Sequence, residues 1–222
     1  MRHWALTLLL GVFALCAHSM PQTGEDSQST ALSDQTLIRI APSTASCEGA
    51  AFPEECADAT QAAEAINMAF KTYGISSSGE RAGLVAYMLF ESGDFRYSKN
   101  HFPGRPGQGT RMMGMPPLVK LYAESVAGVD AVARAEAAGG DAGLDAVLRL
   151  ANCNDEKSFG MAAWFLSTQC TNDTRGGLAT GEMDGWHDFL TSCVGTTLAT
   201  ERDTLWLATT RVLNGEGLSK TR

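Results

Sequence analysis

Apolar residues recur at helical spacing over most of the chain, and this periodicity is the feature that most restricts its fold. Between residues 57 and 73 they stand three or four positions apart. A second helix is expected over residues 77–93, where Ser77 and Glu80 form a capping box at its start. Further helical patterns cover residues 117–126, 129–138, 141–152, 156–168, 182–193 and 200–213, with glycine-rich connections at 139–143 and 176–181.

One segment departs from this pattern. Residues 95–113 are interrupted by proline and glycine, which is typical of short strands and turns. The sequence therefore predicts a mostly helical α+β domain, with a small β region directly after the helix over residues 77–93.

The N-terminus has the layout of a secretory signal peptide. A basic start is followed by an apolar run from Trp4 to Cys16 and by the small-residue site Ala17-His18-Ser19, so we expect residues 1–19 to be removed. Residues 20–45 are rich in Ser, Thr, Gln and Pro and are expected to form a flexible lead-in or pro-segment. A single domain over residues 46–222, secreted and extracellular, should follow, since no later stretch approaches a membrane span.

Charge and composition exclude several classes of protein. Removing Arg2 leaves 16 basic residues (17 − 1) against 25 acidic residues, a net charge of −9. This balance argues against a nucleic-acid partner and against binding to an anionic membrane after signal cleavage. Only His101 and His187 remain after cleavage, and no Cys/His cluster appears, so we expect no metal and no cofactor.

Five cysteines remain after signal cleavage, and an oxidising compartment favours disulfides between them. Two bridges among five cysteines allow fifteen arrangements (five choices of the spare cysteine times three pairings). We expect Cys47–Cys56 and Cys170–Cys193, with Cys153 left as a buried spare rather than a catalytic partner of His187. Asn172-Asp173-Thr174 is a glycosylation sequon, which predicts a surface position for Asn172.

Glu91 is the main candidate for chemistry. It stands at the end of the helix over residues 77–93, and residues 95–123 contain five Lys or Arg and no Asp or Glu. Burial and the negative end of a helix dipole both raise the pKa of a carboxyl group, as a general acid requires. The alternative is a structural Glu91 that forms an ion pair with Arg96 or Arg111.

Two short motifs carry a resemblance to a known superfamily. Glu91-Ser92-Gly93 and the stretch from Gly107 to Pro116 resemble the Glu-Ser-Gly helix end and the Gly-x-x-Gly-x-Met-Gln-x-x-Pro segment of the lysozyme-like superfamily, especially lytic transglycosylases and goose-type lysozymes. The loop from Asn100 to Arg111 is also similar to that of a group of secreted fungal proteins. The resemblance covers residues 91–123, and the glutamine that the family has after methionine is missing, because Met113 and Gly114 stand there.

The resemblance implies a secreted glycosidase that cleaves N-acetylhexosamine polymers, with peptidoglycan first and chitin or chitosan second. Glu91 would be the general acid, and Asp94 would be either a second carboxylate or a solvated turn residue. The family pattern further implies a substrate groove, for which the candidate residues are Tyr97, Arg105, Gln108, Arg111 and Tyr122.

Two other interpretations remain open. The missing glutamine and the single clear carboxylate favour a non-catalytic secreted module that binds cell-wall glycan or acts as an effector. A weaker alternative is a structural secreted protein with no glycan role. An enzyme, either a glycoside hydrolase (muramidase) or a lytic transglycosylase, is the leading hypothesis.

Overall fold

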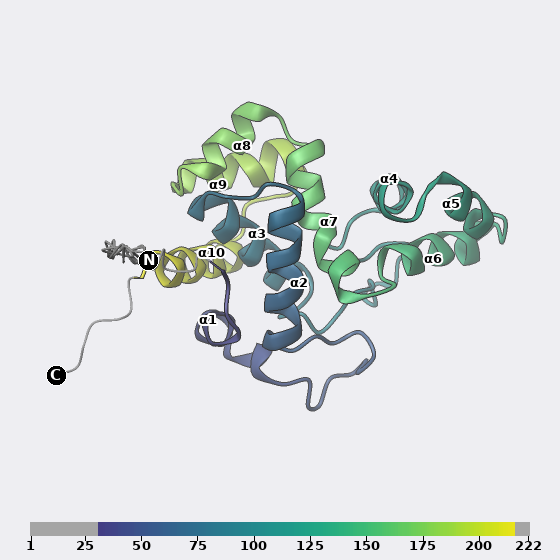
Figure 1. The fold of residues 1–222 in the computed structure, drawn as a ribbon, viewed down its shortest axis with the longest axis horizontal. Coiled ribbons are helices and arrows are strands. Elements are labelled where there is room, and N and C mark those ends of the chain that lie inside the picture. The colour runs from purple at the N-terminus through teal and green to yellow at the C-terminus, as the bar shows by residue number, and fades with distance from the viewer. Residues whose placement is uncertain (1–30, 216–222) are drawn as a thin grey trace, which may run out of the picture. The chain divides into compact units, whose positions relative to one another are not determined.

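A computed structural model describes residues 31–215, in which helices are joined by loops, with long connections over residues 46–58 and 92–115 (Figure 1). The helices are α1 (Asp34–Ile40), η1 (Pro42–Ala45), α2 (Ala59–Thr72), α3 (Ser78–Glu91), α4 (Pro116–Ala127), α5 (Val129–Glu136), α6 (Gly140–Ala151), α7 (Asp155–Thr168), α8 (Asn172–Ala179), α9 (Met183–Asp188), the π-helical segment η2 (Phe189–Val194) and α10 (Thr200–Leu213).

Two helices form the centre of this arrangement, and both are apolar nearly all round. Eight consecutive residues of α3, from 82 to 89, are buried along with Gly79 and Glu80, and α7 is buried from residue 158 to residue 166. A helix that is apolar on every side must be covered by other elements. Here α10 packs along α3 and α2 packs along α7, so the centre is closed by helices from both ends of the described chain.

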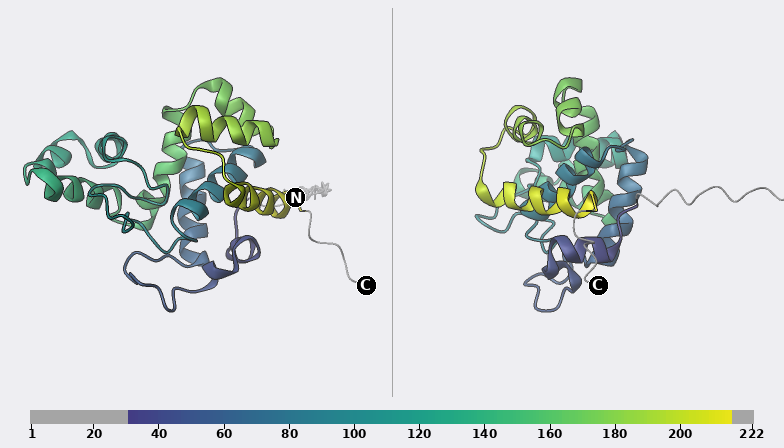
Figure 2. Two further views of the ribbon diagram at one scale, coloured as in Figure 1. Left: turned by 180° about the vertical axis from the view of Figure 1, so that it is seen from behind. Right: turned by 90° about the vertical axis from the view of Figure 1, so that its left-hand side faces the viewer.

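The remaining helices form two smaller groups. Helices α4, α5 and α6 pack against one another, and α8 packs against α9 (Figures 1 and 2). The expected capping box of α3 is present, because the Ser77 hydroxyl accepts from the backbone N–H of Glu80 while the Glu80 carboxylate accepts from that of Ser77. Helical periodicity therefore predicted most elements of this fold to within a few residues.

Helix α8 was not predicted, because its two glycines suggested a connection. In the structure the close approach of α8 to its neighbours depends on glycines of α9 and α3. A Cβ on Gly185 of α9 would collide with the backbone carbonyl of Gly177 in α8, and a Cβ on Gly79 of α3 would collide with that of Leu178. Small residues here are required by packing rather than by flexibility.

The expectation of a flexible lead-in over residues 20–45 is wrong for its second half. Ser33 caps α1 by accepting from the Thr36 N–H, and Leu37 and Ile40 are buried. The Asn67 side chain of α2 also bonds both backbone groups of Leu32, at 2.9 and 2.8 Å. The few apolar residues of this polar stretch are thus enough to dock it. The expected signal peptide lies outside the described residues.

The α+β prediction is also wrong, because residues 31–215 contain no sheet. The segment over residues 95–113 has only the isolated bridges Lys99–Gly109 and Gly109–Gly114. Thr110 and Met113 have φ of 62° and 48°, which is incompatible with an extended strand. Several backbone N–H groups in the segment donate to side chains instead of to a neighbouring strand.

Two disulfides are present, Cys47–Cys56 and Cys170–Cys193, as expected. Cys153 is the free cysteine among the described residues, but it is exposed in the turn between α6 and α7 rather than buried. Asn172 is exposed at the start of α8, and the glycosylation at this position stays a prediction. Within residues 31–215, no helix combines the length and the apolar character needed to span a membrane.

Candidate functional site

Glu91, the last residue of α3, forms an ion pair with Arg202 of α10. Arg202 Nη2 donates to Glu91 Oε1 at 2.9 Å, and the two side chains are 12% and 17% exposed. The guanidinium also donates to the Thr197 carbonyl at 3.1 Å and lies over the Phe90 ring at 4.2 Å. The structural alternative for Glu91 is thus partly correct, although its partner is neither Arg96 nor Arg111.

The carboxyl group of Glu91 has a perturbed acidity. Burial raises the pKa of Glu91 above its ordinary value, and the hydrogen bond and charge of Arg202 oppose this rise without cancelling it. A raised pKa lets a carboxylic acid hold a proton closer to neutral pH. Glu91 can therefore exchange a proton with a molecule bound beside it.

Glu91 borders two cavities. The first, which we call the methionine hollow, has a volume of about 250 Å³ and extends toward α4, α7 and the segment that leads into α10. Its walls include Glu91, Arg202 and several large apolar side chains, namely Met112, Met113, Met115, Leu118, Phe165 and Val194. The Glu91–Arg202 pair supplies the charged groups in an otherwise mainly apolar wall.

The second cavity, which we call the loop hollow, has a volume of about 240 Å³ and shares Glu91 and Met113 with the first. Its other walls are more polar and come mostly from the loop after α3: Phe90, Tyr97, Lys99, Asn100, His101, Phe102 and Gln108. Glu91 therefore lines both hollows, each of which exposes polar and apolar surface in similar amounts.

The loop hollow is held in shape by Glu55, which lies within the Cys47–Cys56 disulfide loop. The Glu55 carboxylate accepts from the backbone N–H groups of Ser98 and Lys99 at 2.9 and 3.1 Å, and its other oxygen bonds His101 Nε2 at 2.8 Å. The His101 ring stacks on Phe52 with centroids 3.6 Å apart. The disulfide loop thus fixes one wall of the hollow.

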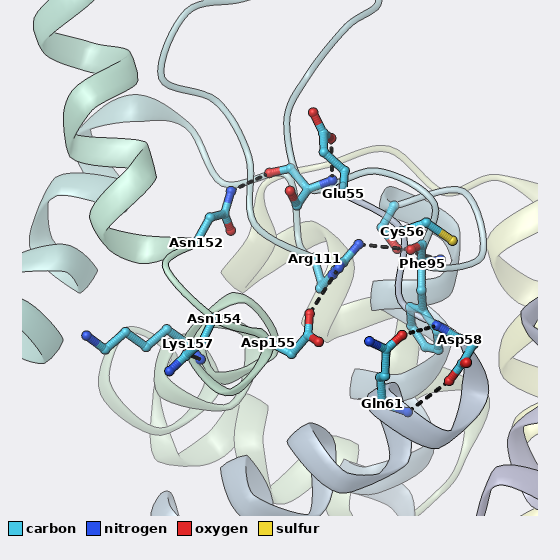
Figure 3. A network of polar contacts seen from close by, with 12 residues as sticks. Glu55, Cys56, Asp58, Gln61, Phe95, Arg111, Asn152, Asn154, Asp155 and Lys157 are labelled. Carbon is cyan, nitrogen blue, oxygen red and sulfur yellow. Dashed lines mark hydrogen bonds and ion pairs between the residues drawn. The ribbon is translucent and has the colours of Figure 1, made fainter. Parts of the chain in front are cut away.

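Arg111 anchors the same loop from within (Figure 3). It is 2% exposed, and its Nη1 donates to the carbonyls of Phe95 and Tyr97 at 2.9 and 3.2 Å. Burial lowers the pKa of Arg111 to about 10, while the nearby Asp155 carboxylate opposes this shift. Arg111 is in place to hold the turn after Glu91 and does not reach either hollow.

The other expected site residues are distributed as follows. Tyr97 and Gln108 line the loop hollow with Glu91, although the Gln108 amide already bonds Asn100 and the Met113 carbonyl. Asp94 accepts from Ser43 at 2.5 Å and lines neither hollow. Arg105 is exposed and also outside both hollows, whereas Tyr122 is buried and donates to the Lys157 carbonyl at 2.7 Å, beside a different cavity.

Two features of the site were missed from the sequence. Arg202 lies 111 residues after Glu91, and nothing in its local sequence distinguishes it from other surface-helix arginines. The methionines did leave a signal, because Met112, Met113 and Met115 stand within four positions directly before a helix. Methionine side chains are flexible and polarisable and suit binding surfaces for irregular apolar molecules.

A metal centre does not fit the described residues. No group of three His, Cys, Asp or Glu side chains in residues 31–215 could hold a metal ion. His101 is bonded to Glu55, and His187 is bonded to Asp203 at 3.1 and 3.2 Å.

Comparisons with known proteins give one informative relative. No protein-family model and no solved structure matches the chain. A Fusarium oxysporum (strain Fo5176) protein named bifunctional dioxygenase (DOX)-epoxy alcohol synthase (EAS) is 40% identical over 151 residues. The match covers 64% of this chain but 11% of the relative, so the chain corresponds to a small part of that protein's length.

This relative corrects the functional expectations drawn from the lysozyme-like resemblance. Its name describes oxygenation and epoxy alcohol synthesis, which contradicts a glycosidase, muramidase or transglycosylase assignment and a cell-wall glycan partner, whether cleaved or only bound. The motif that suggested them has a packing explanation. A Cβ on Gly109 would collide with the Ser98 carbonyl, and one on Gly114 would lie 2.5 Å from Met161 Cε.

The relative's name also implies oxygen chemistry, which proteins perform with metal centres, haem or flavin. Residues 31–215 contain no set of side chains that could hold a metal ion, and we derive no step of a mechanism through a metal or haem.

Proposed function

We propose that this chain is a secreted protein that binds a mainly apolar, oxygenated small molecule of the epoxy alcohol type, and that Glu91 exchanges a proton with that molecule. The observation that carries the proposal is the position of Glu91, a largely buried carboxyl group with a raised pKa that lines both hollows. The chemical class of the ligand comes from the name of the Fusarium relative.

The two hollows match the two parts of such a molecule. Small-molecule sites are mostly apolar and contain a few polar groups that fix orientation. The methionine hollow would take the hydrocarbon portion, and the loop hollow would take polar substituents near Lys99 and Tyr97. The oxygenated carbons would then lie beside Glu91. Asp94, Arg105, Arg111 and Tyr122 have no role in this proposal, because they line neither hollow.

The reaction that fits a single carboxyl group with a raised pKa is the opening of an epoxide by water. Glu91 gives its proton to the epoxide oxygen as one ring C–O bond breaks, and a water oxygen forms a new C–O bond at that carbon. The proton that the water loses returns to the Glu91 carboxylate. One epoxide and one water give one vicinal diol, and no oxidant or reductant is consumed.

The test uses the full chain with its disulfides intact and a mid-chain epoxy alcohol of a long-chain carboxylic acid. Binding is measured by calorimetry, and products formed in water enriched in ¹⁸O are identified by mass spectrometry. We expect binding and a diol that carries one ¹⁸O with the wild type, and binding without diol with Glu91→Gln.

The matched control is Glu64→Gln, because Glu64 is an exposed glutamate on α2 outside both hollows. It should bind and turn over like the wild type. Wild-type binding without diol would remove the proton-transfer half of the proposal. No binding at all would refute the proposal as a whole.

A further inference from the structure

One face of α10 carries a row of buried polar atoms without protein partners. Arg202 Nε, Trp206 Nε1 and Thr210 Oγ1 are all buried, and none has a hydrogen-bond partner among the described residues. The three residues stand four positions apart, so they follow one another along one face of the helix at a spacing of about 6 Å. This is the helix whose Arg202 contacts Glu91.

Leaving three such atoms without any hydrogen-bond partner would cost considerable folding free energy. A buried donor or hydroxyl without a partner destabilises a fold by about 1–3 kcal/mol, and native proteins contain only a few such groups per hundred residues. Buried water, which typically makes about three hydrogen bonds, is the usual partner where protein groups are missing. Three neighbouring positions on one helix face point to several waters rather than one.

The neighbouring tryptophan, Trp186, has the hydrogen-bond acceptor that Trp206 lacks among the described residues. Trp186 of α9 stacks on Trp206, with ring centroids 6.2 Å apart and planes 12° apart. Its Nε1 donates to Asp203 at 2.9 Å, whereas Trp206 Nε1 has no such acceptor among residues 31–215. Of the two stacked indoles, one therefore has an acceptor for its N–H and the other has none among the described residues.

We propose that a file of buried waters runs along α10 past Thr210 and Trp206 to Arg202, and that it supplies the water consumed at Glu91. Waters about 2.8 Å apart can bridge polar groups at this spacing through one or two molecules. The file would reach the Glu91–Arg202 pair at Arg202, which both carries the unpaired Nε and lines the methionine hollow. The supply role rests on the proposed function, whereas the file itself does not.

The first experiment tests the file without any substrate. Magnetisation transfer from water to the indole N–H protons is measured by NMR on the full, disulfide-bonded chain. We expect a direct water contact at the Trp206 Nε1 proton and none at that of Trp186, which donates to a carboxylate. The absence of a water contact at Trp206 would overturn the proposal, whatever the activity of the protein.

The second experiment tests the supply role. Trp206→Phe and Thr210→Val remove one polar atom each and keep most of the side-chain volume. If the file delivers water, each should lower kcat for diol formation about fivefold, the effect of one lost hydrogen bond of about 1 kcal/mol, while the KM for the epoxide stays unchanged. Thr204→Val is the matched control, because Thr204 is exposed on α10 and donates to the Thr200 carbonyl.

The outcomes separate the two proposals. An unchanged kcat in both variants, with a water contact at Trp206, would overturn the supply role and leave the file. A wild type that forms no diol would refute the proton-transfer half of the proposed function, and with it the supply role, while the NMR result would still decide whether the file exists. A parallel rise in KM would indicate a general structural effect and would count against supply.

Discussion

The substitution Arg202→Met should destabilise the protein by an amount that depends strongly on pH. The variant loses a charge-assisted hydrogen bond to Glu91, a hydrogen bond to the Thr197 carbonyl and the contact of the guanidinium with the Phe90 ring. Arg202 is 12% exposed, so these losses are screened little by solvent. Removing one partner of such a pair typically costs about 3–5 kcal/mol, which is the loss expected at pH 7.

The direction of the pH dependence follows from Glu91. Burial already raises its pKa in the folded protein, and the variant loses the Arg202 hydrogen bond and charge that oppose this rise. A carboxyl group whose folded pKa exceeds its unfolded value of about 4.3 favours the fold most below that value, and the benefit is lost as pH rises through the folded pKa. The cost of Arg202→Met should therefore shrink to about 2 kcal/mol at pH 3, where the remaining losses are the carbonyl bond and the ring contact.

The assay is urea unfolding at pH 3 and pH 7 with the disulfides intact, analysed by linear extrapolation. Arg39→Met is the control, because Arg39 is exposed on α1 and its loss should stay within about 0.5 kcal/mol at either pH. Adding Glu91→Gln to Arg202→Met should recover about 1–3 kcal/mol at pH 7, since no unpaired charge is then buried. Equal losses at both pH values, or no recovery in the double variant, would show that the pair is not coupled as argued.

Two further predictions concern the scaffold. Gly185→Ala should cost about 2–3 kcal/mol in urea unfolding, because its Cβ would strike the Gly177 carbonyl. Gly176→Ala, in open space on α8, should instead stabilise by about 0.5–1 kcal/mol. Equal effects of the two substitutions would disprove the contact argument. Glu80→Gln should cost about 2 kcal/mol at pH 7 and less at pH 2.5. Burial alone would raise the pKa of Glu80, but hydrogen bonds from Arg175 and Ser77 hold it below its ordinary value, so its contribution is present above the unfolded pKa and is lost as pH falls through the folded one; a cost unchanged between the two pH values would contradict this.

The helices were predictable because each carries its own signal. The capping box at Ser77 and Glu80, the apolar spacing and the glycine stops are all local, and α2 to α7 follow them closely. The error at residues 95–113 arose because glycine and proline mark any irregular backbone, strand turns and loops alike. This segment is a loop because side chains bond its backbone. Glu55 lies more than 40 residues before the N–H groups that it binds, and Arg111 binds the Phe95 carbonyl from within the loop.

The candidate site was only half visible in the sequence. Glu91 stood out because of its position at a helix end before a stretch free of acidic residues. The identity of its partner depended on how α10 packs on α3, and no local pattern encodes that contact. The lysozyme-like resemblance misled because glycines placed by packing, such as Gly109 and Gly114, coincide with a short motif that has a different use elsewhere.

The described residues around Glu91 come from separate parts of this chain, which bears on how the relative is interpreted. Glu91 comes from α3, Arg202 from α10 and the methionines from the segment before α4, and all lie in one compact unit that begins at residue 31. The greater part of the Fusarium protein has no counterpart here, since the match spans 11% of it. The proposal accordingly concerns the two hollows of this chain alone, and binding of the epoxy alcohol to the isolated chain is the measurement that tests it.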